Sequence, residues 1–417
     1  MAVKSLLRLL LGLLLIPLFA SCSDDKASQA EDLLASVPAD ADMAGVIDME
    51  AAISHLELDK KNPLPELKKR FETLHLNPDC LSGTRMSVAV VFTRGSKFYF
   101  TGYLDDSKAF KKAFSALSKS SFKAEGNVDL CQASTGQWAA VCGNQFWLCD
   151  RGTPDANEIR DYSAQSKGYL SRKGAERLLE FKHDMAILGS ISNFIRNLSP
   201  NTKEDLSSAL VINSLFADPQ YADAWIDFEK ECLTLDAGFL NSSSKPAEFT
   251  LPLKKIDAEV VKQTVTSADM IFAANIPSDA IKRIGKNFGA FLPMQNLEAL
   301  DGTIAISASE KERAISGVIL TNGKNISGLT LLINELAPMD TEVKGNLLFF
   351  HTPGSITGPV NVAEAAKSFG HSYVAAIFKP SRSANFPFSD KWINLSIYPS
   401  GSSARIAIKL SSTPLTK

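Results

Sequence analysis

The chain has 417 residues, of which 45% are hydrophobic and 22% are charged. This composition is ordinary for a globular protein, and the length is sufficient for two domains with hydrophobic cores. The formal net charge is −2 at pH 7, so the chain has no excess of basic residues. This balance excludes the class of strongly basic proteins that attract nucleic acid or anionic membrane surfaces through charge.

The N-terminal segment, residues 1–21, differs from the rest of the chain. Lys4 and Arg8 precede an apolar, leucine-rich run from Leu9 to Phe19. As a helix this run would span about 16 Å, which is too short for a hydrocarbon core of ~30 Å. Basic residues followed by a short apolar run are typical of a signal peptide, so we expect residues 1–21 to be removed.

The end of this segment, Phe19-Ala20-Ser21-Cys22, resembles a bacterial lipobox. In a lipobox a diacylglycerol is attached to the cysteine, and cleavage occurs just before it. The resemblance implies that Cys22 becomes the lipidated N-terminus, whereas the alternative is an ordinary signal peptide followed by a chance cysteine. Each buried methylene contributes about 0.8 kcal/mol, so two or more acyl chains give a stable membrane anchor.

The next residues, Ser23, Asp24, Asp25 and Lys26, resemble the acidic export signal of Bacteroidetes-type lipoproteins that reach the outer leaflet of the outer membrane. The resemblance implies an outer-membrane lipoprotein on the cell surface. Acidic and small residues also form solvated tethers, and on that interpretation the protein faces the periplasm. In either case we expect residues 22–27 to comprise the lipidated cysteine and a tether.

The first half alternates between helical and strand periodicity. Helices are predicted from Ser28 to Pro38, at 63–75, from Ser107 onward, at 171–181, within 190–216 and from Asp218-Pro219. Strands are predicted at 43–49, 85–93, 97–104, 137–142, 145–150, 183–189, 232–240 and 248–253.

The second half follows the same order more tightly. Strands are predicted at 269–275, 303–308, 314–321, 371–379, 392–398 and 405–410, with a hairpin over 342–351. Helices are predicted at 278–289, 325–336 and 362–369.

Two distant segments begin the halves in the same way. Residues 30–48 combine a helical pattern, a turn and an apolar strand, and residues 258–275 repeat this order. Within them, Ala41-Asp42-Met43 is matched by Ala268-Asp269-Met270. Such a long-period repeat indicates a repeated structural unit. We therefore predict an α+β fold with two tandem related domains, 28–254 and 255–417, each a mainly antiparallel sheet with helices packed on one face.

This arrangement resembles a group of Bacteroidetes-type lipoproteins of unknown function. The resemblance depends on Cys22, on Pro38-Ala39-Asp40-Ala41 and on the apolar strand that follows at 43–49. It implies a fold with tandem α+β halves and an envelope location. The group has no catalytic residues to carry over to this chain.

The sequence contains no motif for a metal, a cofactor or a catalytic nucleophile. None of the five histidines stands at metal-ligand spacing from another histidine or a cysteine, and no Gly-x-Ser-x-Gly, phosphate-loop or dinucleotide-binding motif occurs. We therefore expect no cofactor, no metal and no catalytic residues. An odd number of cysteines follows Cys22, which is incompatible with complete disulfide pairing, so we expect mostly buried thiols.

Trp138 and Trp147 are the candidate ligand contacts. They lie on opposite strands of one predicted hairpin and on the same face, diagonally near each other. Aromatic rings in this arrangement could stack on a sugar. The alternative, which we favour, is that the face packs under a helix.

These observations favour a non-catalytic binding or envelope-assembly module anchored in the outer membrane. A protein or glycan partner is expected, in addition to the membrane that the acyl chains enter. The alternative function is an envelope hydrolase acting on glycan or peptide, which would need a carboxylate pair or a Ser/His/Asp set in a cleft. A purely architectural envelope protein is a third hypothesis.

Overall fold

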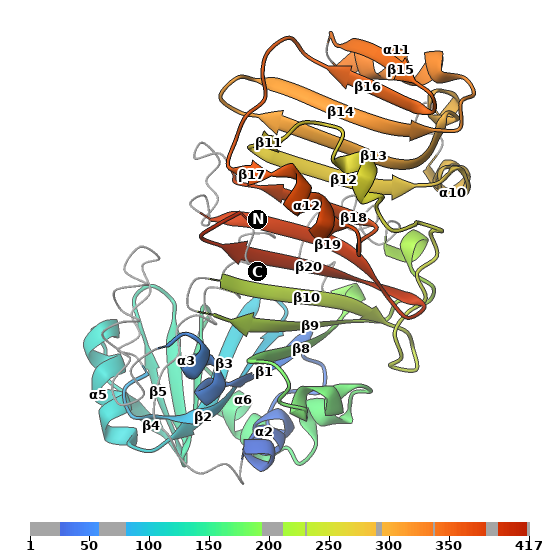
Figure 1. Cartoon of the computed structure of the whole chain (residues 1–417). Coiled ribbons are helices and arrows are strands. Elements are labelled where there is room, and N and C mark those ends of the chain that lie inside the picture. Colours follow the sequence, from blue (N-terminus) through green and yellow to red (C-terminus); the bar gives the residue numbers. More distant parts are fainter. Residues whose placement is uncertain are drawn as a thin grey trace. The chain divides into compact units, whose positions relative to one another are not determined.

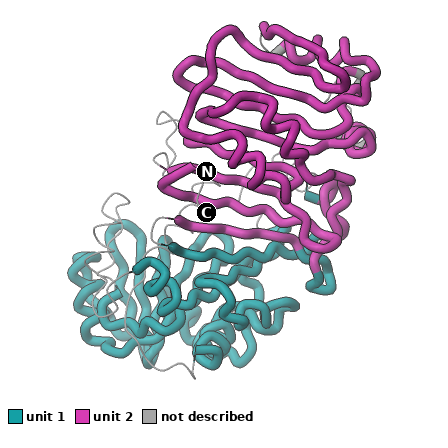
Figure 2. The backbone as a smooth tube through the Cα atoms, viewed as in Figure 1, with its two compact units in different colours: residues 1–212, 219–230, 240–245 teal, residues 213–218, 231–239, 246–417 magenta. Residues whose placement is uncertain are grey.

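The computed structural model describes residues 26–57, 81–193, 212–229, 232–288, 294–336, 338–380 and 391–414. These residues combine helices with long antiparallel strands, which confirms the predicted α+β class (Figure 1). They form two compact units (Figure 2). Unit 1 comprises Met1–Ile212, Pro219–Lys230 and Leu240–Lys245, and unit 2 comprises Asn213–Asp218, Glu231–Phe239 and Pro246–Lys417.

Unit 1 is built on an antiparallel sheet in which the described strands follow the order β4-β5-β6-β7-β3-β2-β1-β8-β9. The strands are β1 (Met43–Asp48), β2 (Thr84–Arg94), β3 (Lys97–Leu104), β4 (Lys123–Glu125), β5 (Val128–Gln132), β6 (Trp138–Cys142), β7 (Gln145–Cys149), β8 (Met185–Ser190) and β9 (Tyr221–Phe228). The helices are α2 (Lys26–Ala35), α3 (Met49–His55), α5 (Ser107–Ser118), α6 (Ala156–Ala164) and the 3-10 turns η3 (Gly168–Ser171) and η4 (Ala175–Leu179).

Unit 2, taken by itself, is built on antiparallel strands in the order β15-β16-β14-β13-β12-β18-β19-β20-β10. The strands are β10 (Cys232–Leu240), β12 (Met270–Ile276), β13 (Leu300–Ser309), β14 (Ala314–Thr321), β15 (Asp340–Lys344), β16 (Leu347–His351), β18 (Val374–Phe378), β19 (Trp392–Ser400) and β20 (Ser403–Ser411), with a separate pair β11 (Ser267–Ala268) and β17 (Val360–Asn361). The helices are α9 (Ala258–Val261), α10 (Ser278–Phe288), η5 (Met294–Leu297), α11 (Ile326–Leu336) and α12 (Val362–Phe369).

Local signals in the sequence account for several elements. Gly95 adopts φ +60° in the turn between β2 and β3, a conformation that glycine reaches without steric cost. Asp106 caps α5, since its carboxylate accepts the backbone N–H groups of Lys108 and Ala109. Phe110 and Phe114 then lie buried on one side of α5, as helical spacing predicts.

Helices cover both faces of each sheet, so the prediction that they pack on one face was wrong. In unit 1, Tyr99 belongs to the core that α2 and α6 cover, whereas its neighbour Phe100 contacts Phe146 on the other face. Phe146 in turn contacts Phe110 of α5, with ring centroids 5.0 Å apart. Successive residues of a strand point to opposite faces, and both faces here are apolar, so each needs a covering layer.

Unit 2 shows the same two-sided arrangement. Val318 of β14 belongs to the core beneath α9 and α12. The next residue, Ile319, belongs to the core beneath α10 and α11. The strands of both units are therefore buried on both sides over much of their length.

The two sheets share their order of strand pairing. In unit 1, β1 pairs with β2 and β8, and β3 pairs with β7. In unit 2, β12 pairs in the same way with β13 and β18, and β14 pairs with β16. A backbone hydrogen bond repeats at the start of the first strand. Asp42 donates its N–H to Thr93 at 2.8 Å, and Asp269 donates its N–H to Ala308 at 3.0 Å.

A second hydrogen bond repeats between the two hairpins. Leu104 donates its N–H to the carbonyl of Asn144 at 2.7 Å, and Thr321 donates its N–H to the carbonyl of Asn346 at 2.8 Å. Each asparagine follows a glycine with φ +61° in its hairpin turn. The same turn chemistry therefore fixes the same long-range contact in both units.

Further sequence predictions differ from the structure. The expected division at residue 254 does not coincide with the units, because residues Cys232 to Ala237 of β10 pair with β20 of unit 2. The helix expected from Asp218-Pro219 is strand β9. The strand expected at 248–253 is reduced to one bridge, between Phe249 and Phe216. The helix expected at 63–75 lies outside the described residues, as does most of the helical stretch expected within 190–216.

Candidate functional site

The residues predicted for lipidation and export fall at the edge of the described chain. Cys22, Ser23, Asp24 and Asp25 lie outside it. Lys26 lies within it, as the first residue of α2 rather than as part of a tether. Its Nζ pairs with Asp48 Oδ1 at 2.9 Å and with Glu50 Oε2 at 2.8 Å. The expected tether 22–27 is therefore shorter than predicted, because Lys26 and Ala27 belong to the fold.

Trp138 and Trp147 are both completely buried in the core of unit 1. Trp138 donates its indole N–H to the carbonyl of Arg151 at 3.3 Å, and its ring packs edge-on against Tyr99 at 5.9 Å between centroids. The predicted register of their hairpin is confirmed, with Trp138 opposite Cys149. Neither ring is accessible to a sugar, so the ligand-contact interpretation was wrong and the alternative of a covered face is the observed one.

An open hollow of about 500 Å³ lies on unit 1, and four of its ten lining residues are acidic. We call it the acidic hollow. It is lined by Pro38, Ala39, Asp40, Arg94, Asp155, Asn157, Glu158, Asp161, Tyr162 and Gln165. These residues come from the loop between α2 and β1, from the end of β2 and from α6 with its flanking residues.

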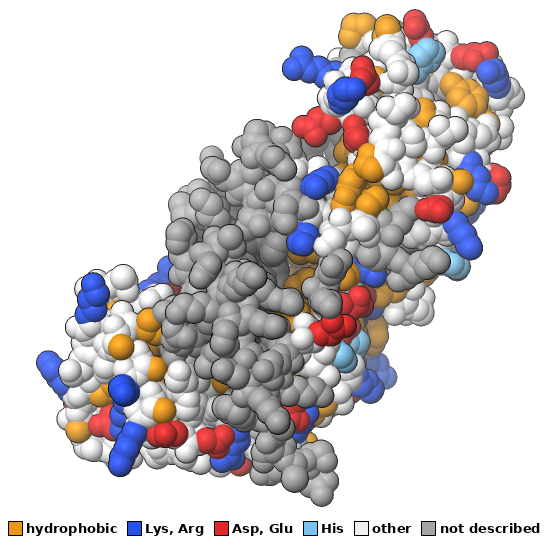
Figure 3. Space-filling view, turned by 60° about the vertical axis from the view of Figure 1, so that its left-hand side comes forward, with side chains coloured by type: hydrophobic (Ala, Val, Ile, Leu, Met, Phe, Trp, Pro, Cys, Tyr) orange, Lys and Arg blue, Asp and Glu red, His pale blue; other side chains and the backbone are white. Residues whose placement is uncertain are grey.

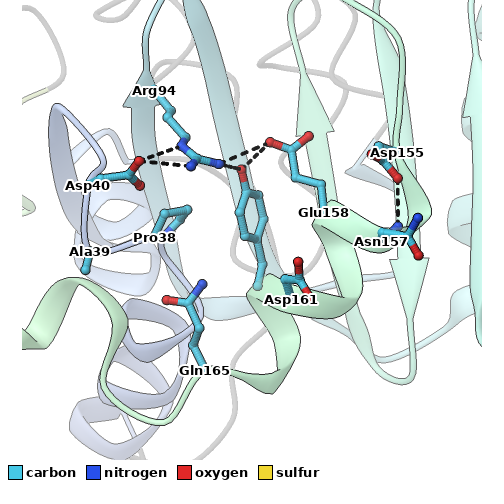
Figure 4. A pocket seen from close by; sticks show the side chains of 10 residues that line it. Pro38, Ala39, Asp40, Arg94, Asp155, Asn157, Glu158, Asp161 and Gln165 are labelled. Atoms are coloured by element: carbon cyan, nitrogen blue, oxygen red, sulfur yellow. Dashed lines mark hydrogen bonds and ion pairs between the residues drawn. The ribbon is translucent and has the colours of Figure 1, made fainter.

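Arg94 is the one cation in this lining, and it lies between carboxylates (Figure 4). Its Nη2 donates to Asp40 Oδ2 at 2.9 Å, and its Nη1 donates to Glu158 Oε1 at 3.5 Å. Nη1 also donates to the hydroxyl of Tyr162 at 3.0 Å. Arg94 therefore joins three segments that are far apart in the sequence, and its charge is shared by two carboxylates.

Glu158 is the most enclosed carboxylate of the hollow. Its Oε1 accepts the hydroxyl of Tyr162 at 2.5 Å and that of Tyr99 at 3.4 Å. Burial raises the pKa of Tyr162, and the hydrogen bond to Glu158 adds to this rise. Tyr162 therefore stays protonated and keeps donating to Glu158 at neutral pH. Asp40, Asp155 and Asp161 are exposed, and of these Asp155 accepts the N–H of Asn157.

The local sequence explains how α6 presents its acidic residues. Asp155 is the N-cap, and its carboxylate accepts the N–H of Asn157 at 2.8 Å. Glu158 stands in the first turn, where the helix dipole favours negative charge. Tyr162 follows one turn later and is buried against Phe92, so the helix is held in place by its apolar side.

Our sequence analysis named Pro38, Ala39 and Asp40 together but missed the other members of the hollow. Asp40 was noted within Pro38-Ala39-Asp40-Ala41 as a turn residue. Arg94 and Glu158 showed no signal, because a charged residue at a hairpin turn or in a first helical turn is ordinary. The N-cap pattern at Asp155 was the available clue to α6.

A second polar cluster lies at the other end of β1, around His55 and Asp184. Nδ1 of His55 is 2.7 Å from Oδ1 of Asp184. The side chain of Asp184 is only 1% exposed, whereas that of His55 is 58% exposed. Burial raises the pKa of Asp184, while the N–H of Phe228, which donates to Oδ2 at 2.7 Å, opposes the rise.

A further imidazole extends this cluster. Nδ1 of His183 is 2.9 Å from Oδ2 of Asp227, and its ring stacks on Trp225 with centroids 5.2 Å apart. Asp227 also accepts the backbone N–H of Asp184 at 3.3 Å. Across the residues that the structure describes, no group of three or more His, Cys, Asp or Glu side chains has the arrangement of a metal site.

On the described part of the face drawn in Figure 3, Lys and Arg side chains lie among Asp and Glu side chains rather than in a separate field. Cys131 and Cys149 are buried free thiols, Cys142 is a half-buried free thiol, and Cys232 is buried. No helix within the described ranges has the length and hydrophobicity needed to cross a bilayer.

Comparison with known proteins adds little to this description. No family model and no curated protein matches the chain. Crystal forms III and I of TP0453, a Treponema protein, each superpose with a TM-score of 0.31 and 10% identity, over 80% of this chain and 96% and 94% of that chain. Crystal form IV gives a TM-score of 0.30 and 13% identity, over 52% and 83%. These TM-scores are too low to support an inference about fold or function.

Proposed function

We propose that this protein is an outer-membrane lipoprotein, acylated at Cys22, that acts as a non-catalytic binding or envelope-assembly module. The lipobox resemblance at Cys22 and the acidic residues after it support the anchor and the export signal. The proposed export signal is Ser23, Asp24, Asp25 and Lys26, of which Lys26 also pairs with Asp48 and Glu50 in the fold. The protein belongs to the group of envelope lipoproteins that its sequence resembles.

The folded part consists of two copies of one α+β module. The shared order of strand pairing and the repeated backbone hydrogen bonds support this proposal. Asp42 and Asp269 stand at the same place in the two copies, and each carboxylate accepts a backbone N–H at the first hairpin turn, from Gly95 and from Glu310. A copied module would retain such bonds because the hairpin turn depends on them.

The observation that carries the binding function is the acidic hollow. Its lining holds the carboxylates of Asp40, Asp155, Glu158 and Asp161 and the guanidinium of Arg94. The ammonium of Lys97 also lies 3.7 Å from Glu158 Oε2, so the carboxylates exceed these cations by two. The equivalent positions in unit 2 are uncharged. Ser267 occupies the position of Asp40, and Ser309 occupies the position of Arg94. An excess of carboxylates around an open hollow attracts a cationic partner. The partner is therefore a protein segment or a glycan that carries positively charged amines.

The test measures binding of a lysine-rich peptide by the full protein, with the same peptide acetylated on its lysines as the ligand control. We expect binding of the unmodified peptide that weakens with salt, because the attraction is screened. Asp40→Asn combined with Asp161→Asn should abolish it. The matched control, Asp340→Asn with Glu342→Gln on exposed strand β15, removes the same charge from unit 2 and should leave it unchanged. Equal affinities in both variants would reject the hollow as the site.

The anchor is tested separately by mass spectrometry of the mature N-terminus. We expect a triacylated or diacylated cysteine at position 22, and Cys22→Ala should release the protein from the membrane fraction. An unmodified amino end would reject the lipoprotein proposal.

One observation favours the alternative, an envelope hydrolase on glycan or peptide. The buried carboxylate of Asp184 orients the exposed ring of His55, and a ring that donates from Nδ1 presents Nε2 as a proton acceptor. Incubating the protein with purified cell-wall sacculi tests it. Release of soluble fragments that disappears with His55→Ala would favour the hydrolase, and no release would reject it.

A further inference from the structure

The folded body begins close to the cysteine that the sequence marks for lipidation. Lys26 is the first residue of α2, and its side chain is 19% exposed between Asp48 and Glu50. These ion pairs hold the start of α2 against the start of α3. An extended chain advances at most about 3.6 Å per residue, so the path from Cys22 to Lys26 spans at most about 14 Å.

The acidic hollow lies at the opposite end of the first strand. Asp48 ends β1 and marks the end next to Lys26. Asp42 precedes β1, and its carboxylate accepts the N–H of Gly95 at 2.7 Å, beside Arg94 of the hollow. A strand rises about 3.3 Å per residue, so the two ends of β1 are about 17 Å apart.

We propose that unit 1 stands on the membrane with the start of α2 and the helix α3 toward the lipid head groups, and that the acidic hollow opens away from the bilayer. This orientation rests on the proposed acylation of Cys22. If the hollow instead faced the bilayer, Lys26 would lie at least the length of β1 from the surface. The path from Cys22 is shorter than that distance, which favours the orientation with α2 and α3 toward the head groups.

The exposed face of α3 is then the surface that meets the head groups. Ser54 and His55 lie on this face, and both are exposed. Ala164, at the end of α6, is exposed on the side of the hollow. The two positions report on opposite ends of unit 1.

The experiment uses the full acylated protein in phosphatidylethanolamine vesicles that contain a lipid with a nitroxide on its head group. A fluorophore is attached to Ser54→Cys or to Ala164→Cys, in a background where every native cysteine except Cys22 is alanine. We expect loss of emission at position 54 and none at position 164. Circular dichroism of each labelled variant establishes that it is folded.

A variant with twelve Gly-Ser residues between Asp25 and Lys26 provides the control. Such a linker has a root-mean-square length of about 20 Å, so it frees the body from the surface. We expect the emission at position 54 to recover to the level at position 164. Equal quenching at both positions, stronger quenching at 164, or quenching at 54 that the linker does not relieve would overturn the orientation. Mass spectrometry of the same samples separates these results from a failure of acylation.

Discussion

Units 1 and 2 pair their strands in the same order but differ in what is added to the sheet. Unit 1 carries the extra hairpin strands β4 and β5, and α6 packs against β5 and β6. In unit 2 the helix that precedes the corresponding single strand, α12, packs against α9 instead. The acidic hollow is formed where α6 meets the end of β2, so it depends on an element placed differently in the two units.

This comparison separates the residues whose hydrogen bonds occur in both units from the residues whose charge occurs only in unit 1. Asp42 and Asp269 make matched hydrogen bonds, so a carboxylate at this place serves the hairpin. Arg94 has no charged counterpart in unit 2, where the equivalent residue is Ser309. The hairpin of β13 and β14 forms without an arginine at this position. The same logic applies to Asp184, whose backbone carbonyl accepts an N–H from Asp48, as Tyr373 does from Asn275. The backbone hydrogen bond therefore occurs in both units, whereas the buried carboxylate of Asp184 occurs only in unit 1.

The largest expected effect concerns the glycines that lie opposite phenylalanines in the two sheets. A Cβ on Gly317 would overlap the ring of Phe350, which is buried and cannot swing aside. A Cβ on Gly102 would lie 3.1 Å from Cε1 of Phe146, a contact that a small shift relieves. We expect Gly317→Ala to cost about 3 kcal/mol in the free energy of unfolding and Gly102→Ala less than about 1 kcal/mol. Urea denaturation measures both.

The control for this pair is Gly345→Ala, at a turn where a Cβ would meet nothing but φ is +61°. It separates backbone strain from steric overlap. An equal loss of stability in Gly317→Ala and Gly102→Ala would contradict the tighter packing of Phe350 on Gly317 than of Phe146 on Gly102.

The next effect concerns the matched aspartates. Asp42→Ala removes the acceptor of the Gly95 N–H, and Asp269→Ala removes the acceptor of the Glu310 N–H. A hydrogen bond to a charged group contributes about 1.5 kcal/mol or more, so each variant should lose about that much stability. Asp32→Ala, at an exposed position of α2, is the control and should be neutral. Thermal or urea unfolding that shows a loss in one aspartate variant and none in the other would break the equivalence of the two turns.

The last effect appears only at alkaline pH and comes from one tyrosine in each unit, the buried Tyr169 and the half-buried Tyr398. Burial raises the pKa of Tyr169 and of Tyr398 from 10.0 to about 12. A raised pKa means that the stabilising contribution is complete below the unfolded value and is lost as pH rises from about 10 to about 12. We therefore expect the free energy of unfolding to fall over this interval, with a smaller slope in Tyr169→Phe and in Tyr398→Phe.

Ultraviolet absorbance near 295 nm follows the ionisation directly in this experiment. Tyr169 is the more deeply buried residue, and its hydroxyl donates to the carbonyl of Leu188 at 2.6 Å. Its variant should therefore change the slope more than Tyr398→Phe does. A larger change in Tyr398→Phe would place the stronger alkaline sensitivity in unit 2.

Much of the local structure was predictable because it depends on neighbouring residues. The hairpin of β6 and β7, with Trp138 opposite Cys149, follows from alternation around Gly143-Asn144. The helix after Asp106 follows from its N-cap and from the spacing of Phe110 and Phe114. The strand β9 was mistaken for a helix because Pro219 suits a first helical turn, and its alternating pattern was given too little weight.

The sequence by itself determined where the helices, strands and turns lie in most of the described chain, because periodicity, caps and turn glycines act over a few residues. It also predicted a repeat, since a similar local pattern occurs twice. Only the tertiary structure decided that helices cover both faces of each sheet and that β10 pairs with β20. It alone brought Asp40, Arg94 and Glu158 together. Such contacts join residues that are distant in the sequence, and their energy depends on packing that no local pattern encodes.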